Sequence, residues 1–458
     1  MLNKSARIHF VGIGGIGMSA LAQVLLSRGY IVSGSDINLN NLTRLVEFKG
    51  GRIYKGHDRK NVGDAEIVVY STAVSKDNPE LLEAAKRHLK ILHRGELLGE
   101  LMKDKIGVAV TGAHGKTTTT SMLSDIMIKA RLDPVCILGG ESVNLRSNAY
   151  AGKGKYLIAE ADESDGSHLY LNPKFAILTN VDREHVDYYE NMEELVKINR
   201  SFLKRIHPDG IFFGLIDNEF IRKILLHYDR RFATFGLSKE ADLHAANIHM
   251  EGMISRFDCI YHKENLGTIN IKIPGIHNVL NALAASIFAL HIGIDFNVIR
   301  DALSLFKSSK RRFEVYPDTD GITLVEDYAH HPTEISAALE ACRLLKPRRL
   351  ITVFQPHRYT RTKALSNEFG LCFGLSDELI LTNIYAASEP PIEGVTVKNI
   401  YDKVLENNFE NVHIMPKENI ADYLYNSSED GDLIAVLGAG DISEVAKELA
   451  QRFKDEPR

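Results

Sequence analysis

The segment "IGVAVTGAHGKTTTT", residues 106–120, joins an apolar run to a glycine-rich turn and a helix start. The apolar run predicts a buried strand, and the turn "GAHGKT" predicts a phosphate-binding loop. Val110 stands where a full Walker A loop has its first glycine, so the pattern is a shortened form. In such a loop backbone N–H groups cradle phosphates, while Lys116 can neutralise β and γ oxygens and the Thr117 hydroxyl can ligate Mg²⁺. A helix cap without a ligand is the alternative, but the preceding strand favours ATP binding.

Short β-branched runs alternate with helical patterns on both sides of this segment. They include "YIVSGSD" (30–36), "AEIVVYS" (65–71), "RLITVFQ" (349–355) and "DLIAVLG" (432–438). Strands separated by helices are typical of parallel sheets, so we predict an α/β fold, with an antiparallel patch in the less regular stretch at 230–273. Since a domain has roughly 150 residues, a chain of 458 residues predicts three domains. The order of strands and motifs places them at residues 1–103, 104–310 and 311–458.

A second glycine motif lies near the N-terminus. The stretch "VGIGGIGMSALA", residues 11–22, contains Gly-x-Gly-x-x-Gly between a predicted strand and helix, and Asp36 follows about 20 residues later. Glycines at these positions let backbone N–H groups approach a diphosphate at a helix N-terminus. The motif alone favours a dinucleotide over a structural turn, but any diphosphate would satisfy it.

Acidic clusters follow two later predicted strands. They are "AEADESD", residues 159–165, and "TNVDREHVD", residues 179–187. Carboxylates near a triphosphate suit Mg²⁺, which prefers oxygen ligands. Glu160 is therefore a candidate ligand, with a solvated turn carboxylate as the alternative. His185 is a less usual Mg²⁺ ligand, and alone it would be interpreted as a hydrogen-bonded structural histidine.

The last third of the chain carries a basic motif, "FQPHRYTRT", residues 354–362, directly after a predicted strand. The guanidinium groups of Arg358 and Arg361 can bind a carboxylate or phosphate through two hydrogen bonds each. Other polar motifs are "GIHNVLNALAA" (275–285), "KRRFE" (310–314) and "EDYAHHPTE" (326–334). Each motif alone has a plain alternative, namely surface charge or ordinary loop histidines.

Composition excludes several classes of protein. Hydrophobic residues make up 44% and charged residues 25% of the chain, as in globular proteins, and the net charge of −5 argues against nucleic-acid binding. The 4 cysteines show no disulfide or zinc spacing, and the N-terminus shows no signal peptide. The longest apolar window, residues 279–294, is too short and too polar for a membrane span, so we predict a core helix and a cytoplasmic protein without membrane insertion.

Taken in this order, the motifs resemble those of the Mur ligase family over nearly the whole chain, from "HFVGIGGIGMSALA" to "GAGDI". "GAHGKTTTT", "EADESD", "HNVLNALAA", "RRFE", "DYAHHPTE" and "FQPHRYTRT" carry the resemblance, and "QPHRYTRT" is most similar to members that add L-alanine. The resemblance implies an N-terminal Rossmann-like domain for a UDP-sugar, a central ATPase domain and a C-terminal Rossmann-like domain. It also implies that "GIGGIG" cradles the diphosphate of UDP, with no redox cofactor.

The reaction that the resemblance implies is ligation of L-alanine to the lactyl carboxylate of UDP-N-acetylmuramate, a step in peptidoglycan precursor synthesis and hence in cell-wall growth and division. ATP and Mg²⁺ would be the cofactors, and an acyl phosphate the intermediate. Charge accumulates on oxygen in both steps, so fixed cations are the main requirement. A hinge near residues 307–313 would let the third domain reach the phosphates.

The resemblance also assigns site residues. Lys116, His185, Arg358 and Arg361 would be catalytic, with Thr117, Glu160 and His185 as metal ligands. The nucleotide would contact Gly112, Ala113, His114, Gly115, Lys116, Thr117, Thr118, Asn278, Asn281, Arg312 and Asp327. The UDP-sugar would contact Gly14, Gly15, Gly17, Ser71 and Arg94, whereas His357, Arg358 and Arg361 would face L-alanine and the muramyl carboxylate.

The sequence departs from the family pattern at two places. Ala113 stands where the family often has threonine, and "DREH" replaces the commoner acidic pattern before His185. Some Mur ligases hold the second metal with a carbamylated lysine; Lys197 is the nearest lysine, but its spacing does not predict the modification. The general base, and the choice between monomer and homodimer, are left open.

Three other functions remain as alternatives. A recycling ligase that attaches a whole peptide to UDP-N-acetylmuramate shares the glycine loop and "HHPT". An NAD-dependent oxidoreductase explains "GIGGIG" but leaves "GAHGKTTTT" without a role. A nucleotide-switched binding protein would use ATP without ligation.

Overall fold

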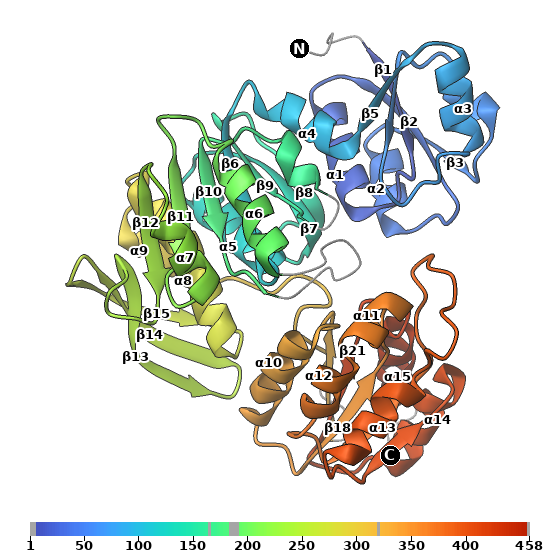
Figure 1. Cartoon of the computed structure of the whole chain (residues 1–458), viewed down its shortest axis with the longest axis vertical. Helices are drawn as coiled ribbons and strands as arrows, with labels where there is room; N and C mark the ends of the chain where they lie inside the picture. The colour runs from blue at the N-terminus through green and yellow to red at the C-terminus, as the bar shows by residue number, and fades with distance from the viewer. Residues whose placement is uncertain (1–5, 164–165, 183–191, 318–320, 456–458) are drawn as a thin grey trace.

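Three β-sheets follow one another along the chain and divide it into three α/β domains (Figure 1). The computed structural model describes residues 6–163, 166–182, 192–317 and 321–455. The α/β fold class predicted from the sequence is confirmed. The domain boundaries after residues 103 and 310 stay predictions.

The first sheet has five parallel strands in the order β3-β2-β1-β4-β5. Its elements are β1 (Arg7–Val11), α1 (Ile16–Ser27), β2 (Ile31–Asp36), α2 (Asn41–Phe48), β3 (Arg52–Lys55), β4 (Ile67–Tyr70), α3 (Pro79–Lys86), β5 (Lys90–His93) and α4 (Arg94–Met102). The chain turns from one side of β1 to the other between β3 and β4, and ligands of such sheets bind where the strand order reverses, at the carboxyl ends of the strands. The glycine motif follows β1 and Ser71 follows β4, so both lie at this edge.

The central sheet has ten strands in the order β15-β14-β13-β12-β11-β10-β6-β9-β7-β8. Its strands are β6 (Ile106–Thr111), β7 (Val135–Ser142), β8 (Ser147–Ala151), β9 (Tyr156–Glu160), β10 (Phe175–Leu178), β11 (Ile211–Leu215), β12 (Phe232–Gly236), β13 (Leu243–Glu251), β14 (Ile254–Tyr261) and β15 (Glu264–Ile271). Its helices are α5 (Lys116–Lys129), α6 (Met192–Leu203), α7 (Glu219–Leu225), α8 (Ile276–His291) and α9 (Phe296–Ser304), with a 3₁₀ turn η2 (Ser167–Tyr170). The predicted antiparallel patch is confirmed for β13 to β15, whereas β12 pairs in parallel with β11. The predicted core helix is α8, which packs against α5.

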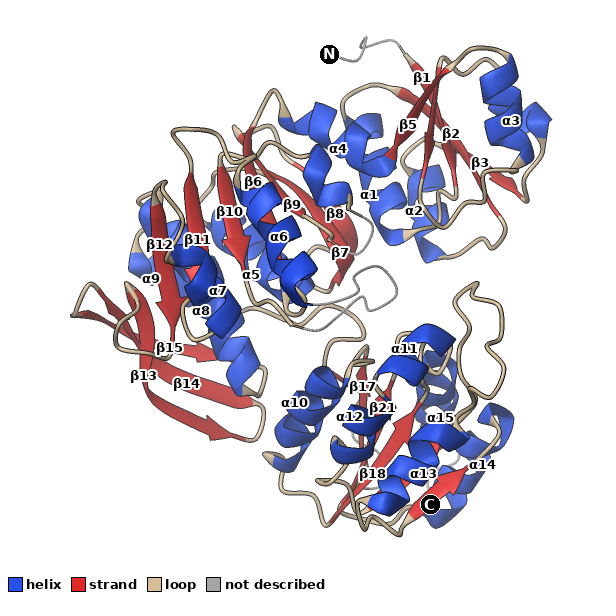
Figure 2. Ribbon diagram, viewed as in Figure 1, coloured by secondary structure: helices blue, strands red, loops and turns tan. Residues whose placement is uncertain are grey.

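The third sheet has six strands in the order β16-β17-β21-β18-β19-β20. Its elements are β16 (Glu314–Val315), β17 (Thr323–Asp327), α10 (Pro332–Arg343), β18 (Arg349–Phe354), α11 (Tyr359–Ala364), α12 (Ser366–Leu371), β19 (Glu378–Leu381), α13 (Lys398–Glu406), β20 (Val412–Ile414), α14 (Lys417–Ser427), β21 (Asp432–Leu437) and α15 (Ser443–Asp455). Alternate residues of the strands pack into two separate cores, one under α10, α12 and α13 and the other under α14 and α15. Helices therefore cover both faces, as expected for parallel strands (Figure 2).

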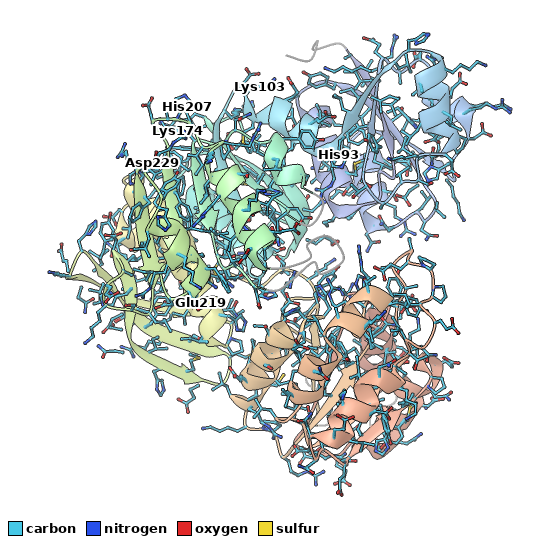
Figure 3. The ribbon with its side chains drawn as sticks, viewed as in Figure 1. His93, Lys103, Lys174, His207, Glu219 and Asp229 are labelled. Atoms are coloured by element: carbon cyan, nitrogen blue, oxygen red, sulfur yellow. The ribbon has the colours of Figure 1, made fainter. Side chains whose placement is uncertain are left out.

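The first and central domains share one continuous apolar core, whereas the third domain has cores of its own. Helix α1 of the first domain packs against β7 and β8 of the central domain. His93, which caps α4, lies at the same junction, and its ring packs against Tyr170 of η2 (Figure 3). All four cysteines are buried thiols. Across the described ranges, no helix is both long and apolar enough to cross a bilayer.

Candidate active site

The predicted phosphate loop connects β6 to α5, as the sequence indicates. Gly112 and Gly115 have φ angles of +125° and +78°, and a Cβ atom there would collide with Thr179 and Asn281, so both positions require glycine. Two residues that follow β10 hold the loop in place: the His114 N–H donates to Asn180 Oδ1 (2.8 Å), and Thr179 Oγ1 donates to the His114 carbonyl (2.6 Å). No described side chain caps the N-terminus of α5. Its first N–H groups therefore face the position where a phosphate would bind.

Lys116 lies over this loop. Its Nζ donates to the carbonyl oxygens of Gly112 (2.5 Å) and Ala113 (3.1 Å) and to Glu163 Oε1 (3.0 Å). Glu163 is buried and also accepts a hydrogen bond from Thr111 Oγ1 (3.3 Å). Burial raises the pKa of Glu163, and the positive charge of Lys116 opposes this shift. The ammonium group is thus held within the phosphate loop, and its contact with phosphate oxygens stays a prediction.

Glu160, a predicted metal ligand, ends β9 beside the loop. Its Oε2 accepts from Thr117 Oγ1 (3.2 Å), the other described metal candidate, and its Oε1 accepts from the Gly139 N–H (2.5 Å). Burial raises the pKa of the Glu160 carboxyl. A carboxylate and a hydroxyl so placed are hard oxygen donors, and a divalent cation would offset the cost of the buried charge, so the residues fit Mg²⁺. His185, the third predicted ligand, lies outside the described residues.

A cavity of about 180 Å³ lies between the central and third domains, next to the loop. It brings together the predicted nucleotide residues His114, Gly115, Thr118, Asn278, Asn281, Arg312 and Asp327. Apolar walls come from Leu215, Phe235, Leu280 and Phe313. The cavity thus combines an apolar slot with a few polar groups, which is the usual composition of a small-molecule site.

The polar groups of the cavity are shifted by burial. Burial raises the pKa of Asp327 to about 6, although its carboxylate accepts from the backbone N–H groups of Phe313 (2.6 Å) and Ala329 (2.7 Å). Burial also lowers the pKa of His277 to about 4, so this ring is neutral near pH 7. Arg311 and Phe313, in the predicted hinge, have φ angles of +60° and +48°. Such left-handed backbone is costly for residues with side chains, which marks this segment as a functional candidate.

A group of side chains, here called the latch, joins the phosphate loop to the third domain. His114 lies between two carboxylates, with Nε2 at 2.9 Å from Asp182 Oδ2 and Nδ1 at 3.1 Å from Glu334 Oε1. Thr333 Oγ1 donates to the same Asp182 oxygen (2.9 Å). His114, Asp182 and His331 present possible metal-ligand atoms within 4.8 Å of one another. Hydrogen bonds already engage them, however, since His331 Nδ1 also caps α10, and we interpret the group as a contact between domains.

The glycine motif of the first domain forms a turn with internal hydrogen bonds. The Gly14 N–H donates to Asp36 Oδ2 (2.8 Å) and the Gly15 N–H to the Gly12 carbonyl (3.2 Å), and contact of these glycines with the UDP-sugar stays a prediction. Their contribution is close approach of the backbone, because a Cβ on Gly14 would lie 2.8 Å from Asp36. A diphosphate would meet the N–H groups in the first turn of α1, which includes Gly17.

Arg94 connects this site to the central domain. Its Nη1 lies 3.5 Å from the position of a Cβ built on Gly17, and its Nη2 is 3.4 Å from Asp162 Oδ2. Asp162 comes two residues after Glu160, so Arg94 spans from the first turn of α1 to the acidic strand end. The UDP-sugar and metal candidates therefore face one another across the first junction.

The basic motif of the third domain forms a compact cluster after β18. Arg361 is buried, and its Nη1 lies 3.1 Å from His357 Nδ1. The His357 ring stacks on Tyr385 and meets His330 edge-on, with ring centres 5.7 Å apart in both pairs. Arg358 has a φ angle of +72° and its Nη1 lies 3.6 Å from Glu389 Oε1. Figure 1 shows the third domain apart from the first domain, with α11, which carries Arg361, on the side toward the first domain.

Sequence reasoning missed several residues of this site. They are Asp182, Glu334, Tyr385 and Glu389, together with Asn180 under the loop. Asp182 and Glu334 belong to motifs noted in the sequence, but no local spacing indicates that they meet His114.

Three family models match the chain: "Mur ligase family, catalytic domain" at residues 7–106, "Mur ligase middle domain" at 110–289, and "Mur ligase, glutamate ligase domain" at 311–440. A curated relative, the UDP-N-acetylmuramate–L-alanine ligase of Geotalea daltonii, is 43% identical over 458 residues, which is 100% of both chains. The chain belongs to the Mur ligase family. The resemblance seen in its motifs is thereby confirmed.

Solved structures agree with this assignment. The UDP-N-acetylmuramate-alanine ligase of Thermotoga maritima superposes on this Mur ligase with a TM-score of 0.84 at 28% identity, covering 98% of this chain and 99% of that one. A murein peptide ligase from Psychrobacter arcticus gives a TM-score of 0.75 at 22% identity, covering 99% of this chain and 100% of that one. The second similarity shows a shared fold alone.

Proposed function

We propose that this Mur ligase joins L-alanine to the lactyl carboxylate of UDP-N-acetylmuramate, with conversion of ATP to ADP and phosphate, in peptidoglycan precursor synthesis. The observation that carries the proposal is that a phosphate loop lies beside a hydroxyl and a carboxylate that could hold Mg²⁺, while the third domain carries an Arg–His cluster. The relative named UDP-N-acetylmuramate–L-alanine ligase, which is 43% identical over the full length of this chain, supports the choice of substrates. A cytoplasmic location belongs to the same proposal.

The chemistry has two steps. A lactyl carboxylate oxygen attacks the γ-phosphorus of ATP while the bond to the ADP oxygen breaks, which gives an acyl phosphate. The amine of L-alanine then attacks the acyl carbon, loses a proton and expels phosphate as the amide bond forms. Activation is needed because a carboxylate is a poor acceptor for an amine.

The central domain supplies the groups for the first step. Lys116 would move from the loop carbonyls to the β and γ oxygens, and the N-terminal N–H groups of α5 would bind phosphate oxygens. Thr117 and Glu160 would hold Mg²⁺, which supplies positive charge to the transferring phosphoryl group when it is bound. His185 remains a proposed ligand of a second Mg²⁺. Asn278, Asn281, Arg312 and Asp327 would surround the nucleoside in the cavity.

The outer domains supply the two substrates. The first turn of α1 and Arg94 would bind the UDP diphosphate, with Ser71 at the adjacent strand end. Arg361 would bind the carboxylate of L-alanine, with His357 and Arg358 beside it. Because the third domain stands apart from the first (Figure 1), the second step requires rotation about the segment 307–313.

Mass spectrometry of the product tests the proposal. The enzyme is incubated with ATP, Mg²⁺, UDP-N-acetylmuramate and L-alanine, and the expected product is UDP-N-acetylmuramoyl-L-alanine together with ADP. Product only with a tripeptide in place of L-alanine would establish the recycling ligase instead. ATP hydrolysis without any amide product would favour the nucleotide-switched binding protein, and reduction of NAD would favour the oxidoreductase.

A further inference from the structure

The latch continues beyond the phosphate loop into the third domain. Glu334 is the third residue of α10, and its two carboxylate oxygens contact different partners. Oε1 lies 3.1 Å from His114 Nδ1 of the phosphate loop, whereas Oε2 accepts the His330 backbone N–H at 3.1 Å and lies 3.2 Å from His330 Nδ1. A single half-buried carboxylate therefore contacts the nucleotide loop on one side and His330 on the other.

His330 in turn belongs to the amino-acid cluster. Its Nδ1 lies 2.9 Å from the Tyr328 carbonyl as well as beside Glu334, so an N–H at Nδ1 is shared between two acceptors and the ring orientation is fixed. The other side of the ring meets His357 edge-on at 5.7 Å, and His357 contacts Arg361. The contacts run without interruption from the phosphate loop to the guanidinium proposed to bind L-alanine.

Charge is matched at the phosphate-loop end of this path. Glu334 faces His114, His330 and Arg312, which hold its pKa well below the usual range despite burial. Burial lowers the pKa of His330, in contrast, so this ring faces Glu334 as a neutral N–H donor near pH 7. Asp182, on the other side of His114, also has a lowered pKa, since the hydrogen bond and charge of His114 offset its burial. Two ionised carboxylates accept but cannot donate, so the geometry calls for a His114 ring that donates at both nitrogens. The latch thus depends on charge as well as on shape.

We propose that Glu334 is a positioning residue that links the nucleotide loop to the amino-acid site. Its contact with His114 depends on the conformation of the phosphate loop, and its contact with His330 orients His357 and Arg361. The inference rests on the proposed function. Glu334 itself lies on the path between the two sites and touches neither L-alanine nor the acyl carbon. A helix-capping carboxylate is the plain alternative, because glutamate at this position stabilises a helix N-terminus.

The test compares steady-state constants of Glu334→Gln with those of the unchanged enzyme. Glutamine keeps the shape and can still cap the helix, but it removes the charge that faces His114 and His330. We expect KM for L-alanine at saturating ATP to rise about tenfold, the size expected for loss of one charge-assisted hydrogen bond, with little change in melting temperature. The matched control is Glu340→Gln, an exposed glutamate on the same helix, for which KM should not change.

A double-mutant cycle separates coupling from two local effects. His114→Asn breaks the same path from the central domain, so the double variant should be no worse for L-alanine than the more affected single variant. Additive effects would overturn the proposal, as would a Glu334→Gln enzyme in which KM rises for ATP alone. A melting temperature that falls with KM for L-alanine unchanged would establish the capping role instead. Failure of the unchanged enzyme to form the amide would refute the proposed function, a result distinct from all of these.

Discussion

The two junctions between domains are built differently. At the first junction, α1 and the central sheet share an apolar core that encloses Gln23 and Asn148, which are 1% and 0% exposed. Asn148 Nδ2 donates to the Ile16 carbonyl (2.5 Å) and to Ser19 Oγ (2.8 Å), and its Oδ1 accepts from Gln23 Nε2 (2.7 Å). At the second junction, half-buried charged groups surround a cavity instead.

This difference has a functional meaning. Buried amides that satisfy one another fix a single arrangement, because any displacement leaves polar atoms unpaired in an apolar core. The first junction thus holds the first turn of α1 at a constant position relative to the phosphate loop. The second junction can open at low cost, since its charged groups can return to water, and nucleotide entry and domain closure require this freedom.

The largest expected effect comes from Lys116→Ala, which removes the cation of the phosphate loop, next to the second junction. Amide formation should fall by about 10²–10³-fold or more, because the charge that develops on the γ-phosphate loses its fixed partner. Binding of the UDP-sugar, measured by titration calorimetry, should be retained since its site lies on the other side of the first junction. Lys103→Ala, an exposed lysine at the end of α4 (Figure 3), is the control. Lost UDP-sugar binding with ATP turnover preserved would show that the roles have been assigned to the wrong domains.

Glu160→Gln should come next. The side chain keeps its shape and can still pair with Thr117, but it loses the negative charge that suits Mg²⁺. The Mg²⁺ concentration for half-maximal velocity should rise by about tenfold or more, while the melting temperature without Mg²⁺ is maintained or increases, because a buried charge is removed. Velocity is measured against Mg²⁺ at saturating ATP. An unchanged Mg²⁺ requirement would exclude Glu160 as a ligand.

Asn148→Ala breaks the first junction. Removal of the amide takes away the acceptor of the buried Gln23 Nε2 and one of the donors to the Ile16 carbonyl, which should lower the free energy of unfolding by about 1–3 kcal/mol. KM for the UDP-sugar should also rise, because the first turn of α1 loses its anchor. Denaturant unfolding and initial rates measure the two effects. Asn172→Ala, at an exposed position, should change neither, and a neutral Asn148→Ala would contradict the view that this junction is rigid.

Thr333→Val should have the smallest effect. It removes one hydrogen bond of the latch at an exposed position, where a net loss of about 0.5–1 kcal/mol is expected. Proteolysis in the segment 307–313 should become two- to fivefold faster in the absence of nucleotide and return to the normal rate when ATP is bound. Equal rates with and without nucleotide would show that ATP does not stabilise the second junction.

The sequence predicts contiguous features well and contacts between domains poorly. The phosphate loop, the metal candidates Thr117 and Glu160 and the three sheets follow from local patterns, because each depends on residues near one another or at the ends of adjacent strands. The pairing of His114 with Asp182 and Glu334 depends on how two domains dock, and residue spacing carries no information on that.

Distance measurements between spin labels test the central claim most directly. Because the four native cysteines are buried, labels can be directed to Lys60→Cys, Lys239→Cys and Lys363→Cys, which are exposed positions on the first, central and third domains. With UDP-N-acetylmuramate and a non-hydrolysable ATP analogue, the distance from Lys363→Cys to Lys60→Cys should shorten while that from Lys60→Cys to Lys239→Cys stays constant. An active enzyme in which the first distance does not change, or in which the second one does, would contradict a rigid first junction and a closing second one.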